Sequence, residues 1–302
     1  ERGTDMERFY KKASVWLTLP SMLLFFTVIV IPFIIGVIYS FASWRGTYFA
    51  GGSIWESFVG LDNYSRIFRD KKFLSALANT AEYTFLAVIM VNVVSLTLAL
   101  MVHKLIRGGG IFRTIYFIPN LLGGLALGYI WQFIFQIVYT KILFGPEGVI
   151  HIPALMNMTQ NHTKAFWALA LMVTWQQAGY MMIIYLNGLN AISQDLYEAA
   201  KMDGATGGQR FRYLTAPLLM PSFTIVLFLT LSGSFKLLDQ NIALTDGDFN
   251  TRLLAMQILQ TTNDTTPPNY GLAQAQAVVF FVIIAIISLT QVYVTKKREV
   301  EM

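Results

Sequence analysis

Long apolar stretches alternate with short polar segments along this chain. No Asp, Glu, Lys or Arg occurs in residues 13–44, 165–194 or 265–295. A helix needs about 20 apolar residues to cross the hydrocarbon core of a bilayer, so each of these stretches is long enough to span it. The pattern predicts a protein that crosses a membrane several times.

Six apolar stretches predict six transmembrane helices in an all-α fold, forming a single transmembrane domain over residues 1–302. The first stretch holds about 30 residues, beyond the 7–15 of a cleavable signal sequence, and we expect it to be a retained helix. The predicted spans lie near residues 14–42, 79–102, 111–137, 165–189, 218–238 and 272–295.

Composition supports a membrane location. Hydrophobic residues make up 55% of the chain and charged residues 13%, against about 25% charged in soluble domains. The chain has no cysteine, so neither a disulfide framework nor a thiolate metal site is expected.

The distribution of basic residues predicts the orientation. With the N-terminus inside, the inner segments carry thirteen Lys and Arg, whereas the longer outer segments carry eight. Because cytoplasmic loops are enriched in Lys and Arg, we expect both termini in the cytoplasm.

Several kinds of chemistry are missing. The chain lacks a G-x-x-x-x-G-K-[ST] sequence, and its three histidines lack H-E-x-x-H spacing. We therefore expect no ATP hydrolysis, bound cofactor, metal site or nucleic-acid partner for this chain. Lys236 and Asp239 lie three residues apart at the end of a span; they are either functional or extend to the membrane surface.

One polar segment, residues 190–217, separates the fourth and fifth predicted spans. Ser193 followed by Gln194 and Asp195 is typical of a helix start, and Gly204 of a helix stop. The short helix between them has small and apolar residues suited to contact with a partner. A simple polar turn is the alternative interpretation.

This segment resembles the EAA loop of the permease subunits of type I ABC importers, also called binding-protein-dependent transport system inner-membrane components. The matching residues are Glu198-Ala199-Ala200, Gly204 and Leu214-Thr215-Ala216-Pro217. The longer run 195–205 is similar to the carbohydrate branch, which includes maltose-type and glycerol-phosphate-type permeases. Further matches are Val59-Gly60-Leu61-Asp62-Asn63-Tyr64, Asn79-Thr80, Phe112-Arg113, Phe117-Ile118-Pro119 and Leu244-Thr245-Asp246-Gly247.

The chain departs from the family pattern at three places. The family usually has Ile where this chain has Leu214, and Leu where it has Ala216. It often has Gly-Gly-Pro where this chain has Asp246-Gly247-Asp248.

The resemblance implies a division of labour between subunits. The loop would dock on a separate ATPase dimer that binds ATP and magnesium, while a second homologous permease and an external solute-binding protein complete the importer. The ATPase-coupling residues implied by the motif are Leu196, Tyr197, Glu198, Ala199, Ala200, Met202, Asp203, Gly204 and Pro217.

The resemblance also implies a solute pathway through the third to fifth spans, where polar groups interrupt the apolar sequence. Neutral donors and acceptors with an aromatic ring suit a sugar or oligosaccharide. The implied positions are Asn120, Gly124, Gln176, Gln177, Tyr180, Gly233, Ser234 and Leu237.

Other interpretations remain open at this stage. The polar side chains could instead hydrogen-bond neighbouring helices, and the solute could be a polyol or a glycerol phosphodiester. A secondary transporter or channel would need an inverted repeat or an intramembrane charge network, and a membrane enzyme would need a His, Asp or Glu cluster; the sequence shows neither.

Overall fold

The computed structural model describes residues 2–105, 108–263 and 265–299, with side chains from Ser14 onward. Contacts divide the chain into two compact units, where the sequence led us to expect one domain. The first contains residues 1–70 and 258–280, and the second contains residues 71–257 and 281–302. Helix α14 (Tyr270–Lys296) and helix α13 (Leu254–Asn263) contribute to both units.

The first unit begins with a long apolar helix. It consists of α1 (Arg2–Phe25), a π-helical turn η1 (Phe26–Val30) and α2 (Ile31–Tyr39). Residues 14–39 of this helix satisfy the length and hydropathy of a membrane span, and the most apolar part has no buried residue. Such a surface is suited to contact with lipid or with another apolar helix.

The remainder of the first unit is held by polar and aromatic contacts. Its elements are β1 (Trp44–Arg45), β2 (Tyr48–Phe49) and α3 (Asp62–Ile67), with parts of α13 and α14. Asn63 Nδ2 donates hydrogen bonds to the carbonyl oxygens of Ser40 and Ala42, at 2.9 and 3.1 Å. The rings of Trp44 and Tyr270 lie 4.9 Å apart, so the start of α14 packs on the segment that follows α2.

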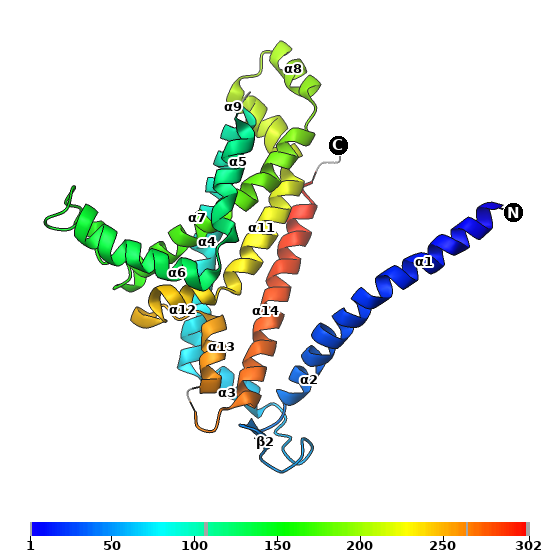
Figure 1. The fold of residues 1–302 in the computed structure, drawn as a ribbon, viewed down its shortest axis with the longest axis vertical. Coiled ribbons are helices and arrows are strands. Elements are labelled where there is room, and N and C mark those ends of the chain that lie inside the picture. The colour runs from blue at the N-terminus through cyan, green and yellow to red at the C-terminus, as the bar shows by residue number, and fades with distance from the viewer. Residues whose placement is uncertain (1, 106–107, 264, 300–302) are drawn as a thin grey trace. The chain divides into compact units, whose positions relative to one another are not determined.

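The second unit is a bundle of long helices that run alongside one another (Figure 1). Its first half contains α4 (Lys71–His103), α5 (Gly109–Phe117), η2 (Ile118–Leu121), α6 (Gly124–Phe133), η3 (Ile134–Leu143) and η4 (Pro153–Leu155). Its second half contains α7 (His162–Ala191), α8 (Gln194–Met202), α9 (Gly207–Arg210), η5 (Phe211–Thr215), α10 (Ala216–Leu218), α11 (Met220–Phe235), α12 (Asp239–Thr245) and η6 (Asp248–Asn250).

Helices α4 and α7 form the centre of this bundle and run parallel. His162, at the start of α7, lies beside Glu82 on α4, and Asn190, near the end of α7, contacts His103 at the end of α4. A glycine permits α5 to approach α7: a Cβ at Gly179 would collide with the carbonyl oxygen of Tyr116. The bundle is therefore held by close backbone packing as well as by apolar side chains.

A buried hydrogen-bond chain joins three of these helices. Tyr185 Oη on α7 donates to Asn92 Oδ1 on α4 at 2.7 Å, and Asn92 Nδ2 donates to Thr230 Oγ1 on α11 at 3.1 Å. Thr230 in turn donates to the carbonyl oxygen of Val226 at 2.8 Å. Because these groups are paired inside the bundle, they fix its register in an apolar setting.

The all-α prediction is confirmed, apart from the two-residue strands. Among the residues that the structure describes, five helices are long and apolar enough to cross a membrane, or six if the pair around Leu219, bent by 67°, counts as one span. The second, fourth and sixth predicted spans lie within α4, α7 and α14.

Pro119 was expected to kink the third predicted span, 111–137, and the structure interrupts the helix there. The structure breaks it between α5 and α6, where Leu122 and Gly123 are extended with ψ of 134° and 143°. Pro119 has no N–H to continue an α-helical ladder, and η2 replaces the helix there. The fifth predicted span, 218–238, corresponds to α11 over most of its length: a bend at Leu219 precedes this helix, which ends at Phe235, short of the predicted boundary.

Candidate functional site

The polar loop between α7 and α11 folds as the sequence predicted. Ser193 Oγ accepts a hydrogen bond from Asp195 N and caps α8 at its start. Gly204 ends α8 with a φ of +79°, and Ala205 N donates to Ala200 O at 3.0 Å. Glycine adopts this left-handed backbone without a Cβ clash, which closes the helix as a Schellman motif.

Helix α8 presents two different faces. Leu196 is 44% exposed and Met202 is 87% exposed, and Glu198, Ala199 and Asp203 are also exposed. Exposed apolar side chains on a polar loop are typical of a surface that contacts a partner. The exposed face of α8 therefore carries two apolar side chains beside polar ones.

The opposite face of α8 is tied to the bundle. Tyr197 and Ala200 are half-buried, and the hydroxyl groups of Tyr197 and Thr215 share a hydrogen bond of 3.0 Å. Thr215 is buried and also donates to Arg210 O at 3.4 Å. Since η5 and α10 lead directly into α11, this hydrogen bond connects α8 to the segment that precedes α11. Pro217 is half-buried in the first turn of α10.

A second group of predicted residues gathers where α11 ends and α12 begins. Gln177, Gly233 and Leu237 line a pocket of about 300 Å³. Lys236, Leu238, Asp239 and Gln240 complete its lining. The pocket thus combines amide, ammonium and carboxylate groups, all of which can hydrogen-bond hydroxyl groups.

Gln176 and Gly124 connect this pocket to the broken third span. Gln176 is buried, donates through Nε2 to Leu122 O at 3.1 Å and accepts from Gln240 Nε2 at 3.0 Å. A Cβ at Gly124 would lie 2.8 Å from the Cβ of Asp239, so only glycine permits this close approach. The break in the span gives Gln176 the free carbonyl that it binds.

The remaining pathway residues are placed less centrally. Ser234 is buried on α11, whereas Asn120 is half-buried in η2. Tyr180 is 39% exposed, and its ring lies edge-on to Phe117 at 6.3 Å. None of these three lines the pocket beside Gln177.

Sequence reasoning missed Thr215 and Gln240. Thr215 lies in the EAA-like motif, but its contact with Tyr197 spans 18 residues. Gln240 follows the end of the predicted fifth span and was not among the predicted pathway residues. Lys236 and Asp239 were recognised as a charged pair, and the structure places both in the pocket lining.

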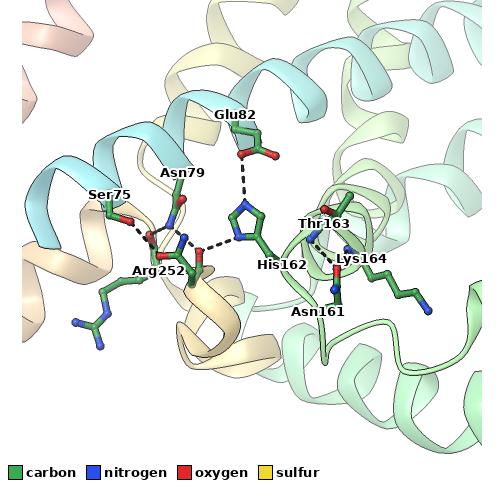
Figure 2. Close-up of polar contacts among 9 residues, drawn as sticks. Ser75, Asn79, Glu82, Asn161, His162, Thr163, Lys164 and Arg252 are labelled. Carbon is green, nitrogen blue, oxygen red and sulfur yellow. Dashed lines mark hydrogen bonds and ion pairs between the residues drawn. The ribbon is translucent and has the colours of Figure 1, made fainter. Parts of the chain in front are cut away.

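Polar side chains also gather at the starts of α4 and α7, where they hold the loop that follows α12 (Figure 2). Figure 2 shows His162 pointing toward Glu82, with Nε2 3.5 Å from the carboxylate, while Nδ1 lies 3.1 Å from Asn250 O. Asn79 Nδ2 donates to Asn250 O and Arg252 O at 2.7 and 3.1 Å. Ser75 Oγ donates to Asn250 Oδ1 at 3.0 Å. This cluster braces the two parallel helices against one loop.

No three His, Asp or Glu side chains gather as a metal ion would require in the part of the chain that the structure describes. The predicted absence of a cofactor stays a prediction.

Known proteins resemble this chain over nearly its whole length. It is 40% identical to the probable starch degradation products transport system permease protein AmyD of Thermoanaerobacterium thermosulfurigenes, over 98% of each chain. It is 31% identical to the multiple sugar-binding transport system permease protein MsmF of Streptococcus mutans, over 89% of this chain and 90% of that one. In a bacterial ABC transporter that imports the acidic polysaccharide alginate, one chain superposes with a TM-score of 0.76 at 19% identity. The match covers 98% of this chain and 99% of that one.

The structural match confirms the predicted fold. A family model described as the binding-protein-dependent transport system inner membrane component matches residues 106–300. That range includes α8, the pocket beside Gln177 and the loop after α12. The chain belongs to this family, the membrane-spanning permease subunits of type I ABC importers.

Proposed function

We propose that this chain forms, together with a second homologous permease, the alternating-access pathway of an importer for sugars or oligosaccharides. Two relatives named for starch products and for multiple sugars support the substrate class. The solved alginate importer in complex with an alginate-bound periplasmic protein supports delivery by an external solute-binding protein.

The two faces of α8 are the single observation that carries this function. One face exposes Leu196 and Met202 for contact with an ATPase subunit, and the other is joined to the bundle through Tyr197 and Thr215. A partner that moves α8 on ATP binding thereby moves the helices that follow. An importer needs such a differential contact to shift between inward-open and outward-open states.

In this scheme ATP and magnesium bind to the ATPase dimer, and this chain moves the solute. The loop with α8 lies in the cytoplasm together with both termini, as the distribution of Lys and Arg favours. The cluster around His162 then lies on the outer side, facing the solute-binding protein.

The pocket beside Gln177 is the proposed contact for the solute. Its amide and charged groups match sugar hydroxyls, and its volume of about 300 Å³ falls at the lower end of the range for ligand pockets. In the assembled importer the second permease would supply the facing wall.

The test is the variant Glu198→Lys, which reverses a charge on the exposed face of α8. We expect normal membrane insertion with loss of solute uptake and of solute-stimulated ATP hydrolysis in proteoliposomes. Lys296→Glu, an equal and opposite charge change at the end of α14, serves as the control. Unchanged uptake by Glu198→Lys would refute the docking role of α8.

A further inference from the structure

A pocket of about 530 Å³ lies behind the coupling helix α8, on the side turned toward the bundle. It is formed by the ends of α4 and α7 together with α8, α9 and η5. Tyr197, which holds α8 to the bundle, is part of its wall. The volume falls within the range of small-molecule binding sites, and the pocket is separate from the one beside Gln177.

The polar lining of this pocket is basic. His103, Lys104 and Arg210 contribute to it, and no carboxylate side chain occurs among its described lining residues. His103 is already oriented, because its Nδ1 shares a hydrogen bond of 3.0 Å with Asn190 Oδ1. Three potential cationic donors around one cavity, without an acidic neighbour in the lining, favour an anion.

Arg210 provides the second observation. The residue is half-buried, its Nε is fully buried, and this nitrogen has no hydrogen-bond partner in the part of the chain that the structure describes. A buried donor without an acceptor costs about 1–3 kcal/mol. A ligand oxygen in the pocket would satisfy it, and guanidinium groups bind phosphate oxygens through paired N–H donors.

The other wall of the pocket is apolar. Leu100 on α4, Leu189 and Ile192 at the end of α7, and Phe211 on η5 line it. A cavity with basic groups and an apolar wall at the end of membrane helices suits a phosphate joined to a less polar body.

We propose that this pocket binds a phosphate group, carried either by an anionic phospholipid of the adjacent leaflet or by a free cytoplasmic phosphate. A ligand there contacts Tyr197 and fills the space between α8 and the bundle, so it restrains the helix that transmits the movement of the ATPase. Its position in the cytoplasm rests on the proposed orientation, but the binding chemistry does not.

The experiment uses the purified full-length chain in nanodiscs and two probes. In phosphatidylcholine nanodiscs, broadening of the ³¹P resonance of inorganic phosphate reports binding of the free ion. In nanodiscs that contain one fifth phosphatidylglycerol, native mass spectrometry reports lipid retained on the protein. We expect binding of one probe at least, and Arg210→Gln to weaken it about tenfold, because the charged donor is lost.

Arg212→Gln is the matched control, since Arg212 is exposed and lies outside the pocket lining. Lys104 lines the pocket but is exposed, so Lys104→Gln provides a second pocket variant if Arg210→Gln does not fold. Phosphate binding alone identifies a free compound, and retained phosphatidylglycerol alone identifies the lipid; either supports the proposal.

Absence of binding by both probes would overturn the proposal, as would equal losses in Arg210→Gln and Arg212→Gln. Because the assay needs neither solute nor ATPase, its failure is distinct from failure of the importer function.

Discussion

Removal of the Tyr197 hydroxyl should weaken coupling between ATP hydrolysis and transport. The change Tyr197→Phe keeps the ring and its packing but deletes the 3.0 Å hydrogen bond to Thr215. One such bond contributes about 0.5–1.5 kcal/mol. That range corresponds to about a two- to twelvefold change in an equilibrium constant. The equilibrium is the one between a state in which α8 moves with α11 and a state in which it does not.

The assay compares solute uptake with ATP hydrolysis in proteoliposomes that contain the complete importer. We expect the solute imported per ATP to fall about two- to twelvefold, with basal ATP hydrolysis retained. Tyr213→Phe is the matched control, because Tyr213 is 71% exposed on the same loop.

A double-mutant cycle makes the test specific. Thr215→Val removes the partner hydroxyl at nearly constant shape, so the double variant should lose little more than either single variant. Additive losses from Tyr197→Phe and Thr215→Val would refute transmission through this bond. An equal loss in Tyr213→Phe would refute it as well.

Three further predictions concern folding and solute contact. Gly179→Ala should abolish folding, because its Cβ would collide with a carbonyl oxygen on α5, whereas a Cβ at Gly123 meets nothing within 4 Å and Gly123→Ala should fold. Size-exclusion profiles in detergent distinguish the two variants. A monodisperse Gly179→Ala protein would contradict the packing of α5 on α7. Tyr185→Phe should lower the free energy of unfolding by about 1 kcal/mol, because it breaks the hydrogen bond to α4; thermal unfolding should show no such loss for Tyr293→Phe, whose side chain is 63% exposed. Gln177→Leu should raise the half-saturating solute concentration about tenfold with ATPase docking intact, since a polar contact in the pocket is lost; unchanged uptake would exclude this residue from the pathway.

Sequence alone predicts much of the structure of loop 190–217 because the signals there are local. Ser193 caps a helix that starts at the next residue, and Gly204 ends it with a positive φ. The distant contact between Tyr197 and Thr215 depends on how the loop folds back, and no periodicity predicts it. The sequence therefore located α8 without showing which of its residues face inward.

The helix breaks were harder to predict. The third predicted span is mostly apolar, and hydropathy does not distinguish a continuous helix from one that is interrupted at Pro119 and extended at Leu122. Membrane helices tolerate such breaks where a neighbour satisfies the freed backbone, as Gln176 does for Leu122 O. The same contact explains why the polar residues of the fourth span are both structural and near the proposed pathway.

Cross-linking of α8 to the ATPase subunit tests the central claim most directly. The chain has no cysteine, so Met202→Cys introduces a single thiol on the exposed face of α8, and Val149→Cys does so at a 77% exposed residue on the loop expected outside. With a thiol-to-amine reagent in intact importer, the account predicts a cross-link to the ATPase from Met202→Cys and none from Val149→Cys. Two results would contradict the account. One is full uptake by a Met202→Cys importer that gives no cross-link, and the other is a cross-link to the ATPase from Val149→Cys but not from Met202→Cys.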